Sequence, residues 1–399
     1  MSNSGKYCLD WHTGPGVQLE LLSPPQLGPG TSGADRLYQL KYTPPLRTTI
    51  RTVQNLPLAQ NDLTEVDNGI NSLVTAVNAR AADPGHGPPS PGPASGNEFQ
   101  TLGDLLFGLI IADYMANDLR LHNLFVEFGI DEELLGYPWE LMHDGSNFLC
   151  LRHYLGRFVN SRTSSPTTQQ VTDRWEKPFD SLSVLVVAVP KPNPRDGVEY
   201  PPLPSAENEL DTLVNTLTGI PDVDVKVLKG REATYTGFFR ALKDPYHIIH
   251  YCGHARVDNA SPIRSSLVLH DQSVATGYLS KFVARAKPIL CFINACETAM
   301  VAAGNQTFNF FGLARAFLDT GAYLLGSRWK INDALAAQFA PAFYTSLLQK
   351  GDPLGKAVCD ARLVCYKKAP DDFAWASYVL YGDPRVGFRR VSESATSST

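Results

Sequence analysis

The chain has 399 residues, of which 43% are hydrophobic and 19% charged, and its formal net charge is -5 at pH 7. This length allows one large domain or two medium ones with a sizeable core. The slight negative charge argues against binding to nucleic acid or to an anionic membrane, and no apolar run approaches the roughly 20 residues that cross a bilayer. The N-terminus lacks a basic segment followed by an apolar one, so we expect a cytoplasmic protein.

The 7 cysteines indicate neither a disulfide framework nor a zinc ribbon, since their number is odd and no CxxC pair occurs. His250, Cys252 and His254 share one face of a strand, but with Cys291 they lack the spacing of a tetrahedral site. No glycine-rich phosphate loop is present. We therefore expect no metal and no cofactor, and we interpret Cys252 and Cys291 as small buried residues.

Composition separates an N-terminal half from a C-terminal half. We expect a flexible segment over 1–36, a lobe over 37–160, a polar hinge over 161–170 and a disordered tail over 391–399. Within the lobe, the expected elements are a strand from 38 to 50 that breaks at a Pro-Pro pair, helices over 58–80 and 100–117, and strands near 119–128 and 147–159. A Gly- and Pro-rich loop over 83–96 separates the two helices.

The second half, 171–390, alternates strands with helices. The expected strands are 183–190, 224–230, 247–254, 265–271, 289–296 and 322–329, and the expected helices are 205–217, 234–244, 276–286, 306–319, 333–349 and 353–367. This rhythm predicts an α/β fold with a mostly parallel sheet and helices on both faces. Ligands of such sheets bind at the carboxyl ends of the strands.

Two of these strands end in reactive side chains. HIIHYCGH ends at His254, and ILCFINAC ends at Cys296. If the strands are neighbours, both groups lie at the same edge of the sheet, where a thiolate could attack an amide carbonyl while the imidazole transfers protons. The alternative, a core cysteine and an unrelated loop histidine, stays open here because separation in sequence does not give separation in space.

Several stretches together resemble the CHAT domain family, which is related to caspases and separases. HIIHYCGHA is similar to the family's H-x-x-x-H-G, SSLVLHD to its L-x-L, and FINACETA to its S/N-A-C-E-T. Further similarity lies in LLGYPWELM, in ARAFLDTGAYLLGSRWKIND and in WASYVLYGDP, so that the resemblance covers about 100–385. It implies a caspase-like, mostly parallel sheet flanked by helices, with an N-terminal pseudo-caspase-like lobe.

The resemblance also implies roles for the two reactive residues. Cys296 would be the nucleophile, His254 the general acid and base, and the backbone N–H groups of Ala255 and Cys296 the oxyanion hole. The family usually has glycine where this chain has Ala255. Alanine keeps the N–H group but restricts the backbone. We interpret His250 as a packed strand histidine.

A specificity pocket is implied by position within the clan. Its predicted lining residues are Asp333, Asp196, Glu199, Asn294 and Trp329. The acidic members would receive a basic P1 side chain, with Asp333 as the main determinant. Two other specificities remain open: Arg195 lies in the same loop and could bind an acidic P1 side chain, and the P1 side chain could be uncharged. Asp333 also has a competing interpretation, as the N-cap of a helix.

Two classes of function follow. The first is a cysteine endopeptidase that cleaves a protein partner after a basic residue, in a bacterial defence or regulated-death pathway. The alternative is a catalytically inactive peptide-binding module of the same fold. No helical repeat of about 34 residues occurs, so we expect activation by a separate protein chain or by the N-terminal segment. The loop over 81–98 is a candidate for proteolytic nicking.

Overall fold

A computed structural model describes most of the chain. The described residues are 6–22, 37–43, 52–57, 64–66, 68–69, 72, 95–121, 123–131, 134–160, 178–193, 198–256, 258, 261, 264–297, 310–328, 333–372 and 374–391. The expected helix over 58–80 lies largely outside these ranges. The hinge over 161–170 and residues 392–399 lie wholly outside them, and so does the expected loop over 83–96 except for its last two residues, which begin a helix.

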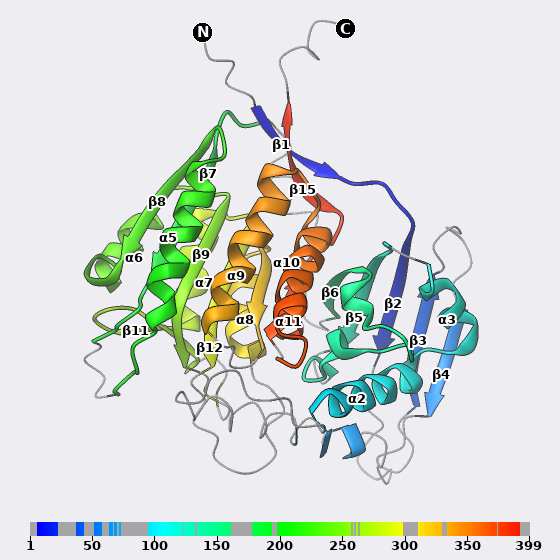
Figure 1. Ribbon diagram of the computed structural model, residues 1–399. Coiled ribbons are helices and arrows are strands. Elements are labelled where there is room, and N and C mark those ends of the chain that lie inside the picture. Colours follow the sequence, from blue (N-terminus) through cyan, green and yellow to red (C-terminus); the bar gives the residue numbers. More distant parts are fainter. Residues whose placement is uncertain are drawn as a thin grey trace, which may run out of the picture.

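The described strands join into one 13-stranded sheet and a separate two-stranded pair (Figure 1). In the large sheet, the C-terminal half of the chain supplies five neighbouring parallel strands, in the order β8 (Val223–Lys229), β7 (Leu182–Ala188), β9 (Ile248–Arg256), β12 (Leu290–Glu297) and β13 (Tyr323–Ser327). The central strands are apolar runs buried on both faces, as expected for a parallel sheet covered by helices. This confirms the α/β fold predicted from the alternating pattern.

The same sheet continues into the N-terminal half. β14 (Tyr378–Tyr381) is antiparallel to β13 and pairs in parallel with β6 (Tyr154–Asn160). Beyond β6 follow, in order, β5 (Phe125–Asp131), β2 (Gly16–Leu22), β3 (Leu37–Thr43) and β4 (Thr52–Pro57). The two halves of the chain are therefore joined by strand pairing.

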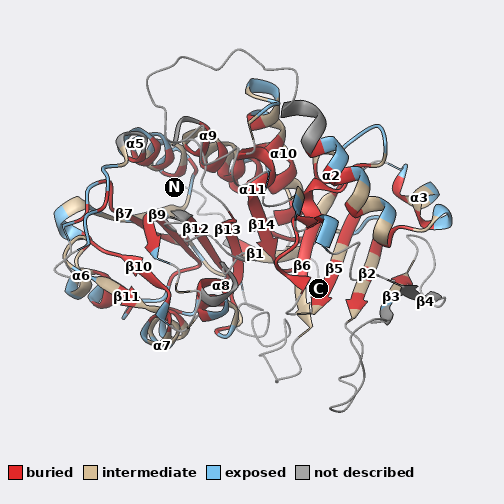
Figure 2. Cartoon of the chain, turned by 90° about the horizontal axis from the view of Figure 1, so that it is seen from below, coloured by how far each residue is buried: buried red, intermediate tan, exposed pale blue. Residues whose placement is uncertain are grey.

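Helices cover both faces of the C-terminal half (Figure 2). On one face lie α5 (Pro204–Thr218), α9 (Asp333–Tyr344) and α10 (Leu354–Lys368), and on the other lie α7 (Thr276–Ala286) and α8 (Phe310–Leu318). The remaining described elements of this half are α6 (Tyr235–Ala241), α11 (Ala374–Ser377), the π-helical turn Thr345–Gln349, and the hairpin β10 (Ser266–Val268) and β11 (Ser273–Ala275). The turn continues directly from α9, which explains the single helix expected over 333–349.

The expected flexible segment over 1–36 is corrected by the structure. Residues 6–22 form β1 (Lys6–Trp11) and β2, and β2 lies inside the large sheet. The sequence GVQLELL alternates buried with half-buried residues, which is the pattern of a strand and was missed in a Gly- and Pro-rich context. β1 pairs antiparallel with β15 (Val386–Val391), so the two terminal strands lie side by side (Figure 1). Val391, predicted as the start of the tail, ends this strand.

The expected helix over 100–117 is two helices. α2 (Ser95–Ile110) and α3 (Asp113–Leu119) meet at a break where Ala112 has an extended backbone. No single helix in the described ranges is long and apolar enough to cross a membrane; α2 and α3 pass that test only together, across a bend of 120°. The expected strand over 147–159 begins with the 3-10 turn Leu149–Leu151 before β6.

A buried charged cluster lies where the two halves meet. Glu140 sits in the 3-10 turn Trp139–Leu141 and is paired with Arg157 of β6, each residue being 2% exposed. Arg328, also buried, follows β13 and donates to the backbone carbonyl oxygens of Gly136 and Tyr137. The turn of the N-terminal half is thus held directly by the strand that precedes the predicted pocket segment.

Candidate active site

His254 and Cys296 are direct partners in the register of two neighbouring parallel strands, β9 and β12. The pair Asn294–Cys252 precedes it by two residues. Because side chains alternate along a strand, His254 and Cys252 belong to one face of β9, and Cys296 and Asn294 to the matching face of β12. The side chain of Cys296 lies outside the described residues, so the backbone register is what places it beside His254.

The imidazole of His254 is held by the loop that precedes α5. Its ring is 1% exposed, Nε2 lies 2.8 Å from the carbonyl oxygen of Pro201, and the ring of Tyr200 packs beside it at a centroid distance of 5.4 Å. A carbonyl oxygen only accepts, so Nε2 carries the hydrogen. In the neutral ring, Nδ1 is then the basic nitrogen that can receive a proton from a thiol.

The backbone at His254 is fixed by Tyr251. The Tyr251 hydroxyl lies 2.7 Å from the carbonyl oxygens of both His254 and Val268, so this single O–H donor bridges the backbones of β9 and β10. Gly253 makes room for this hydroxyl, because a Cβ there would lie 2.6 Å from it. Ala255 continues the strand and is not among the described residues with positive φ. The replacement of the usual glycine by Ala255 therefore brings no left-handed strain.

His250 is a packed strand histidine, as predicted. It is fully buried, and its Nδ1 lies 3.2 Å from the Tyr344 hydroxyl. Burial lowers the pKa of His250 to about 3, so this imidazole is neutral near pH 7. Across the described residues no group of three or more His, Cys, Asp or Glu side chains could hold a metal ion.

The predicted pocket residues are described only in part. Glu199 is exposed in the loop that precedes α5. Asn294 is 5% exposed, and its amide group forms hydrogen bonds with Glu209 and Tyr378. Asp333 is the first residue of α9, but its side chain lies outside the described residues, as do Asp196, Arg195 and Trp329. The pocket and its preference for a basic side chain therefore stay predictions.

Two residues beside the pair were missed from the sequence. Pro201 acts through its carbonyl oxygen, for which no side-chain signal exists. Glu209 is different, because it occupies a helical position next to the apolar stripe of Ala206, Leu210, Leu213 and Leu217 in α5. A glutamate on an apolar helix face is a detectable signal, since it must find buried partners.

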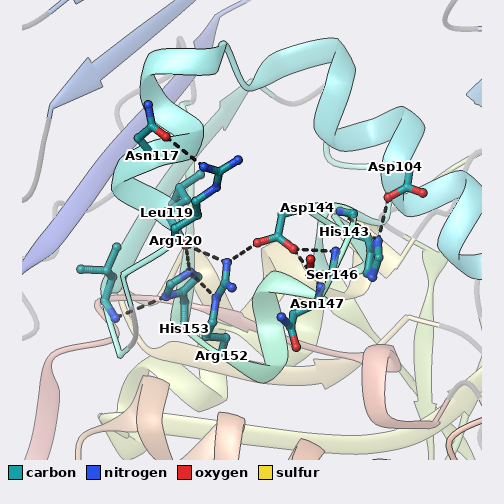
Figure 3. A network of polar contacts seen from close by, with 12 residues as sticks. Asp104, Asn117, Leu119, Arg120, His143, Asp144, Ser146, Asn147, Arg152 and His153 are labelled. Atoms are coloured by element: carbon teal, nitrogen blue, oxygen red, sulfur yellow. Dashed lines mark hydrogen bonds and ion pairs between the residues drawn. The ribbon is translucent and has the colours of Figure 1, made fainter.

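A second gathering of ionisable groups lies in the N-terminal half (Figure 3). Arg152 donates to Asp144 at 2.5 Å and to the Leu119 carbonyl oxygen at 2.7 Å, while His143 pairs with Asp104 at 2.7 Å. Asp144 also accepts from two backbone N–H groups of its own turn. These groups join α2, α3 and the turn before β6, so we interpret the cluster as structural.

Comparisons with known proteins identify the fold. The CHAT domain family matches residues 97–383, which is more than half of the chain. A chain of the Saccharomyces cerevisiae separase–securin complex is similar with a TM-score of 0.54 and 11% identity, over 92% of this chain and 30% of that one. The Arg-specific cysteine proteinase gingipain R is similar with a TM-score of 0.47 and 12% identity, over 76% of this chain and 70% of that one. No curated protein matches the sequence.

Proposed function

This chain belongs to the CHAT domain family, and from that premise we propose that it is a cysteine endopeptidase with Cys296 as nucleophile and His254 as general acid and base. The fold is that of a caspase-like cysteine protease. The observation that carries the proposal is the register pair Cys296–His254 at the carboxyl ends of two central strands. In parallel sheets this edge is where ligands bind.

The chemistry follows from the tautomer of His254. Nδ1 takes the proton of the Cys296 thiol, and the thiolate sulfur attacks the scissile carbonyl carbon. The backbone N–H groups of Ala255 and Cys296 stabilise the oxyanion, each such donor being commonly worth about 3 kcal/mol. The imidazolium then gives its proton to the leaving amine as the C–N bond breaks. Water, deprotonated by the same imidazole, hydrolyses the thioester and releases the acid and the free thiol.

The decisive variant is Cys296→Ala. We expect it to abolish cleavage while leaving the thermal midpoint close to that of the wild type, because alanine lacks the nucleophilic sulfur and differs little in size from cysteine. Cleavage of a diverse peptide library, followed by mass spectrometry, measures the effect. Full cleavage by the variant would refute the assignment, and a wild type that binds peptides without cutting them would support the alternative, an inactive binding module.

The substrate and setting are part of the same proposal. A protein cut after Arg or Lys suits the acidic residues assigned to the pocket, and bacterial defence or regulated cell death suits the family. The separase of the similar structure is in complex with securin, which supports control of this chain by a separate protein. We propose that the chain acts in the cytoplasm.

A further inference from the structure

We propose that Glu209 is a positioning residue for the proposed Cys296–His254 pair, holding the loop of Pro201 and the two strands in one fixed arrangement. The inference rests on the proposed function, since it concerns the geometry of that reaction. Glu209 lies on α5 and is 3% exposed. A carboxylate so deeply buried is strongly unfavourable unless its neighbours donate hydrogen bonds to it.

The neighbours of Glu209 come from both strands of the pair. Asn294 of β12 donates its amide N–H to Oε1 at 2.6 Å, and Cys252 of β9 donates its S–H to Oε2 at 3.3 Å. Each oxygen therefore accepts from a different strand. Asn294 and Cys252 are themselves partners in the register, so the carboxylate bridges one cross-strand pair.

That bridged pair lies directly beneath the reacting one. Cys252 is two residues before His254 and Asn294 is two residues before Cys296, so all four belong to the same face of the sheet. A change in the distance between the two strands at the lower pair is transmitted to the upper pair. Tyr378 extends the contact to β14, donating its hydroxyl to Asn294 Oδ1 at 3.0 Å.

The same carboxylate helps to fix the start of α5, and with it the Pro201 carbonyl oxygen, which accepts the hydrogen bond from His254. The N–H of Leu203 donates to the Pro190 carbonyl oxygen at 2.8 Å, which ties the first residue before α5 to the end of β7. Glu209 ties the second turn of the helix to β9 and β12. Pro201, whose carbonyl oxygen sets the tautomer of the His254 imidazole, lies just before the first of these anchors in the chain.

The two strand groups that donate to Glu209, an amide and a thiol, are both neutral. The histidine nearest to Glu209, His250, lies with Nε2 3.9 Å away, but burial keeps that imidazole neutral near pH 7. Both strand contacts are donors, the pattern that a carboxylate accepts. Glutamine has the same shape but only one acceptor oxygen, so Glu209→Gln loses at least one of the two hydrogen bonds: its N–H₂ group faces either the Asn294 amide, which donates, or the Cys252 sulfur, which accepts only weakly.

The test compares Glu209→Gln with Glu207→Gln, an exposed glutamate two residues earlier on the same helix. We expect Glu209→Gln to lower kcat about 10- to 100-fold, since misplacing reacting groups by about an ångström has such an effect, with KM little changed. Alkylation of Cys296 by iodoacetamide, followed by mass spectrometry, should slow in the same variant. Glu207→Gln should match the wild type in all three measurements.

A swap variant separates positioning from a general need for stability. In Glu209→Gln with Asn294→Asp, the glutamine N–H₂ donates to the new aspartate, Cys252 donates to the glutamine oxygen, and Tyr378 donates to the second aspartate oxygen. This variant restores these three hydrogen bonds and the net charge, so we expect the rate at which iodoacetamide alkylates Cys296, which does not depend on the substrate pocket, to recover most of the loss. A swap variant that keeps the thermal midpoint of the wild type but whose Cys296 alkylation does not recover would overturn the inference.

The outcomes also separate this inference from the proposed function. If the wild type cleaves nothing and Cys296 reacts no faster than a free thiol, the proposed function fails and the role of Glu209 fails with it. If the wild type is active and Glu209→Gln is equally active with equal thiol reactivity, the peptidase assignment stands and only the role of Glu209 is lost.

Discussion

At the scale of single residues, burial separates the thiols of this chain into inert and reactive ones. Burial raises the pKa of Cys150, Cys359 and Cys365 to about 12, and that of Cys291 still further. The thiolate is the reactive form, so these four cysteines carry almost none near neutral pH. Cys296 differs because the proposed proton acceptor, His254, is its partner in the neighbouring strand.

Iodoacetamide at pH 7.5 should therefore label native Cys296 first, well before the four buried cysteines. Mass spectrometry of the digested chain gives the rate at each site, and labelling in urea gives the rate when all 7 cysteines are exposed. Cys296→Ala should remove the fast phase. Labelling of Cys291 as rapidly in the native chain as in urea would contradict the burial argument.

Specificity for a basic P1 residue is the second prediction at this scale. A partly desolvated carboxylate attracts a cation much more strongly than it does in water, so Asp333→Asn should lower kcat/KM for Arg and Lys substrates and leave apolar P1 substrates unaffected. Asparagine also caps helices well, so a capping role alone would leave the preference unchanged. Peptides that differ only at P1 measure the effect. A wild type that prefers apolar or acidic P1 residues would remove Asp333 from the pocket.

At the scale of elements, β1 is a terminal strand held by one buried aromatic side chain. Tyr7 is fully buried, stacks on Phe179 and donates its hydroxyl to the Pro221 carbonyl oxygen at 2.9 Å. The strand therefore connects the paired termini to the connection between α5 and β8.

We expect Tyr7→Ala to lower the free energy of unfolding by about 3 to 5 kcal/mol, the usual effect of removing a buried aromatic ring. Tyr7→Phe keeps the ring and loses one hydrogen bond, so it should cost about 1 kcal/mol. Urea unfolding followed by circular dichroism gives both values. Equal stability of Tyr7→Ala and the wild type would mean that β1 adds nothing to the fold.

The same scale shows what could be predicted from the sequence. The strands and helices of the C-terminal half follow their expected ranges closely, because a buried parallel strand and an amphipathic helix each have a recognisable local pattern of apolar residues. β1 and β2 were missed, since an alternating strand in a Gly- and Pro-rich segment resembles a loop until its partners are known. The order β9–β12, which brings His254 to Cys296, is a non-local property and was expected only through the family resemblance.

Contacts made by backbone atoms were likewise beyond reach. The Pro201 carbonyl oxygen orients His254, yet any residue at that position carries a carbonyl group. Glu209, by contrast, can be recognised in the sequence as a charged residue beside an apolar helical stripe. Its partners, Cys252 and Asn294, become identifiable only once the register of β9 and β12 is known.

At the scale of the whole molecule, the two halves are joined through the sheet and through buried charge. β14 pairs with β6, and Arg328 of the C-terminal half donates to the carbonyl oxygens of Gly136 and Tyr137, just before the turn that contains Glu140. Burial alone would raise the pKa of Glu140, but the guanidinium groups of Arg157, Arg362 and Arg328 outweigh it and hold this pKa below its ordinary value of 4.5. Glu140 is therefore ionised in the folded protein at neutral pH.

Glu140→Gln should destabilise the whole chain, because it leaves the buried guanidinium groups without their carboxylate. Breaking such a pair costs about 3 to 5 kcal/mol. As a control, Asp10→Asn breaks the solvent-accessible pair between half-buried Asp10 and exposed Arg389, whose atoms lie 3.2 Å apart, and should cost less than about 1 kcal/mol.

The pH dependence gives this prediction its sign. The folded-state pKa of Glu140 lies below its unfolded value, so its ionisation stabilises the protein fully above about pH 4.5, and this contribution is lost as the pH falls through the lowered pKa. Glutamine does not titrate. The difference in unfolding free energy between wild type and Glu140→Gln should therefore be largest near neutral pH and shrink below about pH 4.5. A difference that stays constant from pH 7 to pH 3 would mean that lost packing, not lost charge, destabilises the variant.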